Sequence, residues 1–99
     1  VSSMETTIFD RYAPAIIGDR SQMFNALEVQ GVRDLALPDD EGTCIEVDNQ
    51  NPEFFSVYAR YIEGGCDCVG DFSDPADALA YSVELAQKYG WPVFNFTQH

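Results

Sequence analysis

The fold of this chain is decided by residues 54–96, whose sequence is FFSVYARYIEGGCDCVGDFSDPADALAYSVELAQKYGWPVFNF. Residues 54–62 are rich in aromatic and β-branched side chains, which favour a strand. Gly64-Gly65 supplies the positive φ angles of a two-residue hairpin turn, and the register then places Glu63 opposite Cys66. Period-2 alternation gives two expected faces, a buried one with Val57, Ala59, Tyr61, Cys68, Gly70 and Phe72, and an exposed one with Ser56, Tyr58, Arg60, Asp67 and Asp71.

A helix is predicted directly after this hairpin. Asp74 can cap its N-terminus, Pro75 suits the first helical position, and Gly90 can end it in a left-handed conformation. The three- and four-residue spacing of apolar side chains predicts one buried stripe, made of Ala78, Leu79, Ser82, Val83, Leu85, Ala86 and Tyr89. Residues 93–97 then predict a last strand, and Pro92 marks its beginning or a sheet edge.

The N-terminal half predicts helices more than strands. Apolar residues between Ile8 and Ile16 have helical spacing, so we expect a short helix or a pair of turns that ends near Gly18. Residues 21–30 predict a second helix, capped by Ser21 and stopped by Gly31. Residues 32–37 fit a brief strand or an extended connection. The alternation in residues 43–47 predicts a half-exposed strand that pairs antiparallel with the strand starting at Phe54.

Together these elements predict a single α+β domain over residues 4–99. Its sheet is small, antiparallel or mixed, and has about four strands, with a C-terminal β-hairpin–helix–strand unit and two short N-terminal helices. Residues 1–3 precede Met4 and are interpreted as a cloning remnant. No apolar run approaches the roughly 18 residues of a membrane span, so we expect a cytoplasmic protein that does not bind membranes. The sequence does not indicate whether it is a monomer or a homodimer.

The charge balance carries the main functional information in the sequence. Seventeen acidic side chains oppose five basic ones, and the formal net charge is −12. Such a field repels nucleic-acid phosphates and anionic membranes, and it attracts the basic surface of another protein. The alternative interpretation is that the charge serves only solubility.

Much of this charge is concentrated between residues 34 and 53, a stretch without Lys or Arg. The candidate partner-binding residues are Asp34, Asp39, Asp40, Glu41, Glu46, Asp48 and Glu53, with Tyr58 and Arg60 added from the exposed hairpin face. The spacing does not match a helix-loop-helix calcium site. Nothing in the sequence brings two of these carboxylates to the separation that a hydrolytic pair requires.

The cysteines do not predict a metal centre. Cys44, Cys66 and Cys68 are an odd number of thiols, and we expect all three to be free. A structural zinc usually needs four ligands, and only Cys44 and His99 remain to complete a set begun by Cys66 and Cys68. We therefore expect these two cysteines to be small buried hydrophobes.

Motifs for catalysis are also missing from the sequence. His99 is the only histidine and the last residue given, so a Ser-His or Cys-His pair is not expected. We predict no enzyme activity and no cofactor. A small metal-dependent enzyme is kept as a third hypothesis, which metal analysis of the purified protein tests.

The sequence thus favours a small acidic inhibitor that occupies a basic, nucleic-acid-binding surface of a target protein. Charge and size invite comparison with nucleic-acid mimics among phage and plasmid anti-defence proteins, anti-CRISPR proteins included, and with toxin-immunity proteins. No direct binding of nucleic acid is expected. The alternative is an accessory α+β module that binds a peptide or small ligand through its sheet face or edge.

Overall fold

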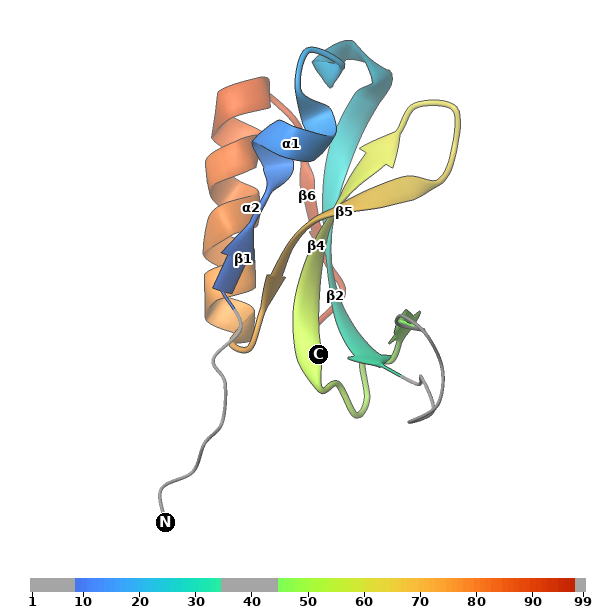
Figure 1. Cartoon of the computed structure of the whole chain (residues 1–99), viewed down its shortest axis with the longest axis vertical. Helices are drawn as coiled ribbons and strands as arrows, with labels where there is room; N and C mark the ends of the chain where they lie inside the picture. The colour runs from blue at the N-terminus through green and yellow to red at the C-terminus, as the bar shows by residue number, and fades with distance from the viewer. Residues whose placement is uncertain (1–8, 35–44, 98–99) are drawn as a thin grey trace.

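The computed structural model describes residues 9–34 and 45–97 (Figure 1). The elements in chain order are β1 (Phe9–Arg11), α1 (Ala13–Ile17), the 3-10 helix η1 (Ser21–Met23), β2 (Phe24–Asp34), β3 (Ile45–Val47), β4 (Phe54–Tyr61), β5 (Cys66–Phe72), α2 (Pro75–Tyr89) and β6 (Val93–Asn95). The prediction that residues 1–3 are a remnant falls outside the described residues.

The architecture is α+β, with one mixed sheet of six strands in the order β1-β5-β4-β2-β3, and β6 pairs with β2 in parallel. The expected sheet of about four strands is therefore wrong. β3 and β6 both lie on the side of β2 away from β4, with β6 beside Leu27–Val29 and β3 beside Val32–Asp34. β3 pairs antiparallel with β2, although the sequence suggested β4 as its partner.

The largest correction concerns β2, because the segment predicted as a second helix is mostly strand. Only Ser21–Met23 form a 3-10 helix, and the chain is extended from Phe24 onward. Leu27 and Val29 are fully buried and pair with Ala59 and Val57 of β4. A short apolar pattern fits a helix and a strand equally well, and a long ladder with β4 decides for the strand.

The first N-terminal element is also shorter than predicted. α1 has five residues, and residues Phe9–Arg11 before it pair with β5 as the edge strand β1. Among the described residues α2 is the only helix longer than α1, so the expected pair of N-terminal helices is not present. Helical spacing in residues 8–16 was misleading because strand pairing is a non-local contact that periodicity does not report.

The predicted hairpin forms, but its register is wrong. Four residues connect Tyr61 to Cys66, and Arg60 pairs with Cys66. Gly64 and Gly65 have φ angles of 112° and 82°, as the turn required. This register places Cys68 opposite Tyr58 and not Tyr61, and a bulge in β5 then adds Val69 as an extra buried residue, so that Val57 pairs with Gly70.

α2 forms where the sequence predicts it. Asp74 accepts a 2.8 Å hydrogen bond from the N–H of Ala76, and Gly90 ends the helix with φ 76°. Its buried residues are Ala78, Tyr81, Ser82 and Leu85, whereas Val83 is 41% exposed. The predicted stripe thus omitted Tyr81 and wrongly included Val83.

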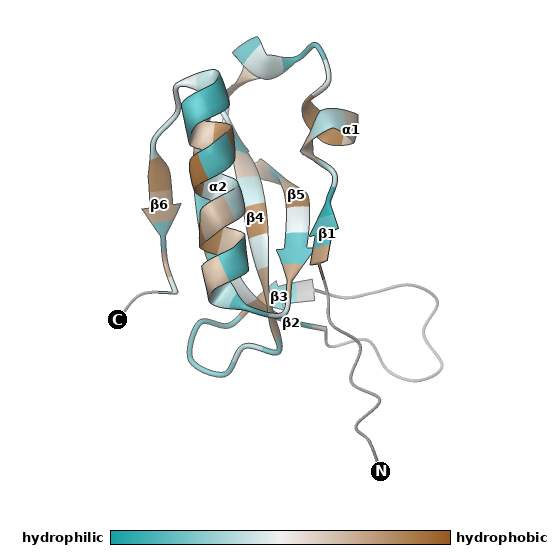
Figure 2. Cartoon of the chain, turned by 90° about the vertical axis from the view of Figure 1, so that its left-hand side faces the viewer, coloured by the Kyte–Doolittle hydropathy of each residue, from teal (hydrophilic) through white to brown (hydrophobic). Residues whose placement is uncertain are grey.

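The helix covers one face of the sheet. Figure 2 shows α2 in front of the sheet and running roughly along its strands, with β6 on one side of it and β5 and β1 on the other. The core between the two layers contains Leu27, Val29, Val57, Ala59, Val69, Phe72, Ala78 and Leu85. Tyr58 and Arg60 of β4 alternate with Val57 and Ala59, so they lie on the face that α2 does not cover.

Candidate functional site

The acidic residues predicted to bind a partner lie in different elements of the structure and differ in their contacts. Asp39, Asp40 and Glu41 lie outside the described residues. Asp34 is the last residue of β2. Glu46 is an exposed residue of β3, and it lies opposite Arg33 in the pairing of β3 with β2. Asp48 and Glu53 flank the turn from β3 to β4 and have structural partners.

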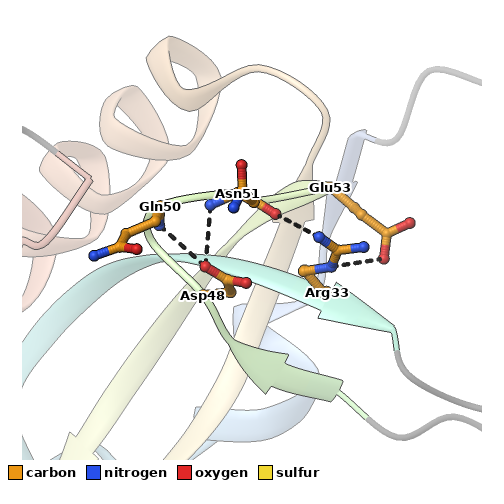
Figure 3. Close-up of polar contacts among 5 residues, drawn as sticks. All are labelled: Arg33, Asp48, Gln50, Asn51 and Glu53. Atoms are coloured by element: carbon orange, nitrogen blue, oxygen red, sulfur yellow. Dashed lines mark hydrogen bonds and ion pairs between the residues drawn. The ribbon is translucent and has the colours of Figure 1, made fainter.

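Asp48 holds this turn. Its Oδ1 accepts hydrogen bonds from the backbone N–H groups of Gln50 at 3.1 Å and Asn51 at 3.0 Å (Figure 3). This is the local side-chain-to-backbone bonding that makes Asp favourable at turns. The Asp48 carboxylate therefore stabilises the turn.

Glu53 lies beside the guanidinium of Arg33. The Glu53 Oε1 and Arg33 Nε atoms are 3.9 Å apart, and Arg33 Nη1 also donates a 3.4 Å bond to the carbonyl oxygen of Asn51 (Figure 3). Both side chains are partly exposed, so the ion pair is worth about 0–1 kcal/mol. The pair offsets one carboxylate of the acidic segment.

Tyr58 and Arg60 are placed on the open sheet face as predicted, but both have partners there. Arg60 Nε lies 3.5 Å from Glu28 Oε2, and the Glu28 side chain is only 14% exposed. Burial raises the pKa of Tyr58 to about 12, so its hydroxyl remains protonated at neutral pH. These side chains do not form one cluster with Glu46 or Asp48 in the contacts described.

A polar network around Asp71 was missed by sequence reasoning. The Asp71 carboxylate accepts hydrogen bonds from the Tyr12 hydroxyl at 2.7 Å and from Ser56 Oγ at 2.6 Å. The Cys68 sulfur lies 2.9 Å from the Tyr12 oxygen and 3.3 Å from Asp71 Oδ1. Burial raises the pKa of Tyr12, so its hydroxyl stays a donor. No local sequence signal links residues so far apart in the chain.

The cysteines differ from expectation in their exposure. Cys66 is exposed and Cys68 is half-buried, and both are free thiols, so the prediction of two buried cysteines is wrong for Cys66. Burial raises the pKa of the Cys68 thiol to about 11, and burial also raises that of Cys66. Both thiols are therefore weak nucleophiles at neutral pH. Cys44 lies outside the described residues.

No group of three or more His, Cys, Asp or Glu side chains within residues 9–34 and 45–97 has the geometry of a metal site. No helix in the same part of the chain is long and apolar enough to cross a membrane. Comparisons of the chain with protein-family models, with curated proteins and with solved structures find no match.

Proposed function

We propose that this protein is an acidic binding module that occupies a basic surface of another protein, in particular the surface that the other protein uses to bind nucleic acid. The observation that carries the proposal is that each of the five basic side chains contacts a group of its own chain. The field of the protein at a distance is set by the formal net charge of −12, which remains after all five positive charges are counted.

The partners of the arginines are mostly carboxylates. Arg11 pairs with Glu84, Arg33 with Glu53 and Arg60 with Glu28, while Arg20 donates to the backbone carbonyl of Ile16. The ammonium of Lys88 lies 5.3 Å from the centre of the Tyr89 ring. Three of the five positive charges are thus paired with a carboxylate, and Arg11 and Lys88 line one hollow together with Glu84.

The uncompensated carboxylates give the surface its character. Exposed Glu46 on β3 belongs to this group, and the sequence adds Asp39, Asp40 and Glu41 just before it. Carboxylates on a small rigid scaffold present the same charge as a phosphate backbone, and a basic groove that binds nucleic acid recognises that charge. Binding of this kind excludes the nucleic acid from its site, which makes the protein an inhibitor.

The test compares three forms of the protein as affinity baits in extracts of its source cells. These are the wild type, a variant with Asp40→Asn, Glu41→Gln and Glu46→Gln, and a control with Asp10→Asn, Asp19→Asn and Glu63→Gln. The control removes the same charge from exposed side chains that lie away from β3. Asp48 is left intact because it holds the turn.

We expect a captured protein with a basic nucleic-acid-binding surface, whose binding weakens at least about tenfold between 0.1 and 0.5 M salt. The Asp40→Asn/Glu41→Gln/Glu46→Gln variant should lose binding more than the control, and nucleic acid should compete with the wild type. A complex that is insensitive to salt and to these three substitutions would contradict the proposal.

A further inference from the structure

Among the described strands, β6 lies at an edge of the sheet and pairs with β2 alone. The N–H of Leu27 donates to the carbonyl oxygen of Pro92 at 3.0 Å, and the N–H of Phe96 donates to that of Val29 at 2.9 Å. In a parallel ladder this pattern directs the backbone groups of Phe94 toward β2 and those of Val93 and Asn95 away from it. No strand within residues 9–34 and 45–97 lies on that outer side.

The side chains along this edge are unusual for so charged a chain. Residues 93–97, with the sequence VFNFT, contain no charge. Phe94 and Phe96 are 43% and 45% exposed, and their two-residue spacing places them on the same face. Val47 of β3 is 50% exposed and lies on that face too. Phe94 pairs with Glu28 of β2, and Val47 pairs with Val32 of the same strand. Glu28 and Val32 are four residues apart, an even spacing, so their partners share one face of the sheet.

We propose that the outer edge of β6 binds an extended, basic segment of a partner protein, which adds to the sheet as a further strand. This inference rests on the proposed function and specifies where the partner attaches. The main-chain groups of Val93 and Asn95 supply the hydrogen bonds, and Phe94 and Phe96 provide an apolar contact for alternate side chains of the segment.

Charge complementarity selects this occupant over a second copy of the chain. Two copies of net charge −12 repel one another, whereas a Lys- or Arg-containing segment is attracted. β6 runs parallel to β2 and therefore points toward β3. A segment bound along β6 and extended by about four residues, roughly 13 Å, reaches the level of Glu46, which is exposed on β3. Because Glu46 alternates with Val47, its carboxylate lies on the sheet face opposite to Phe94. Lys or Arg side chains on that face of the segment meet Glu46, while apolar side chains on the other face contact Phe94 and Phe96.

The probe is a library of random decapeptides selected on the wild-type protein at 0.1 M salt. Enriched peptides should alternate β-branched or aromatic residues with Lys or Arg. Their binding should fall at least about tenfold in the variant Phe94→Thr/Phe96→Thr, which retains strand-forming residues. A matched control, Met23→Thr/Ile62→Thr, changes two side chains that are 43% and 59% exposed at the other end of the sheet, and it should bind as the wild type does.

Hydrogen exchange measures the geometry directly. Binding of an enriched peptide should slow exchange at the amides of Val93 and Asn95, and the same peptide N-methylated at alternate amides should lose affinity. The inference is overturned if no peptide is enriched, or if enriched peptides bind the Phe94→Thr/Phe96→Thr variant unchanged. It is also overturned if the protein sediments as a dimer without peptide and the amides of Val93 and Asn95 are already protected in that dimer. Enrichment of uncharged peptides that use the edge would instead contradict the proposed function and leave the edge site intact.

Discussion

The hydroxyl oxygen of Tyr81 in α2 accepts a 3.1 Å hydrogen bond from the backbone N–H of Ala13, the first residue of α1. Both residues are buried, and the Tyr81 ring also lies beneath the Arg11 guanidinium at 4.6 Å. The first N–H groups of a helix have no partner within it, so this bond satisfies one of them from another element. It ties the chain after β1 to the middle of α2.

Tyr81→Phe should therefore destabilise the protein by about 1–3 kcal/mol, since it keeps the ring but leaves the buried N–H of Ala13 unpaired. Urea unfolding measures the change. Tyr89→Phe is the control, because Tyr89 is half-buried and contacts Trp91 through its ring, with centroids 4.5 Å apart. Equal stabilities of the two variants would show that the hydroxyl of Tyr81 has no such role.

Two positions of α2 distinguish its buried side from its exposed side. Leu85 is 4% exposed, and Leu85→Ala should cost about 2–5 kcal/mol, the range for truncation of a buried leucine. Val83 is 41% exposed, and Val83→Ala should change the free energy of unfolding by about 0.5 kcal/mol or less. Chemical denaturation tests both, and a larger loss at Val83 would mean that the helix is rotated.

Gly31 should not tolerate a side chain. A Cβ atom there would lie 2.7 Å from Pro52 Cβ and 3.1 Å from Asn49 Oδ1, closer than such atoms pack. Gly31→Ala should push the turn away, cost about 1–3 kcal/mol and weaken the 2.8 Å bond from the N–H of Asp48 to the Gly31 carbonyl. Hydrogen exchange at Asp48 should accelerate, and unchanged exchange would contradict this packing.

The two described cysteines should react at different rates. In a Cys44→Ser background at pH 8, Cys66 should be alkylated faster than Cys68, because Cys66 is exposed and the pKa of Cys68 is raised to about 11. Reaction at Cys68 should keep accelerating up to about pH 11, since only the thiolate reacts. Peptide mass spectrometry after timed quenching measures both rates. Comparable rates at pH 8 would contradict the described burial.

Stability should decline in alkaline solution. Burial raises the folded-state pKa of Cys68 from 9.0 to about 11 and that of Tyr58 from 10.0 to about 12, so both groups favour their neutral forms in the fold. Their contribution is fully present below the unfolded pKa values and is lost as the pH rises from about 9 to 12. Urea unfolding at pH 7.5, 9.5 and 10.5 tests this expectation. Cys68→Ser, which cannot ionise there, should show a smaller decline, and an equal decline would exclude the thiol as a cause.

The sequence by itself determined the elements whose signals are local. The capping bond of Asp74, Pro75 at the first position and Gly90 at the end specify α2 within a few residues of each boundary. The composition of β4 and β5 and the positive φ angles of Gly64 and Gly65 likewise identify the hairpin. The net charge, on which the proposed function depends, is a property of composition alone.

Only the tertiary structure decided features that depend on distant residues. Residues 24–30 became strand because β4 pairs along them, and Gly31, which looked like a helix stop, is needed where the Asn49–Pro52 turn packs on β2. The bulge at Val69 shifts the hairpin register by one residue beyond Cys68, and the Asp71 network joins Tyr12 to β5 across 59 positions of sequence. The place of β6 beside β2, parallel to it, is likewise a contact that no local pattern encodes. Local signals depend on backbone conformation within one element, whereas pairing and packing depend on which surfaces meet when the chain folds.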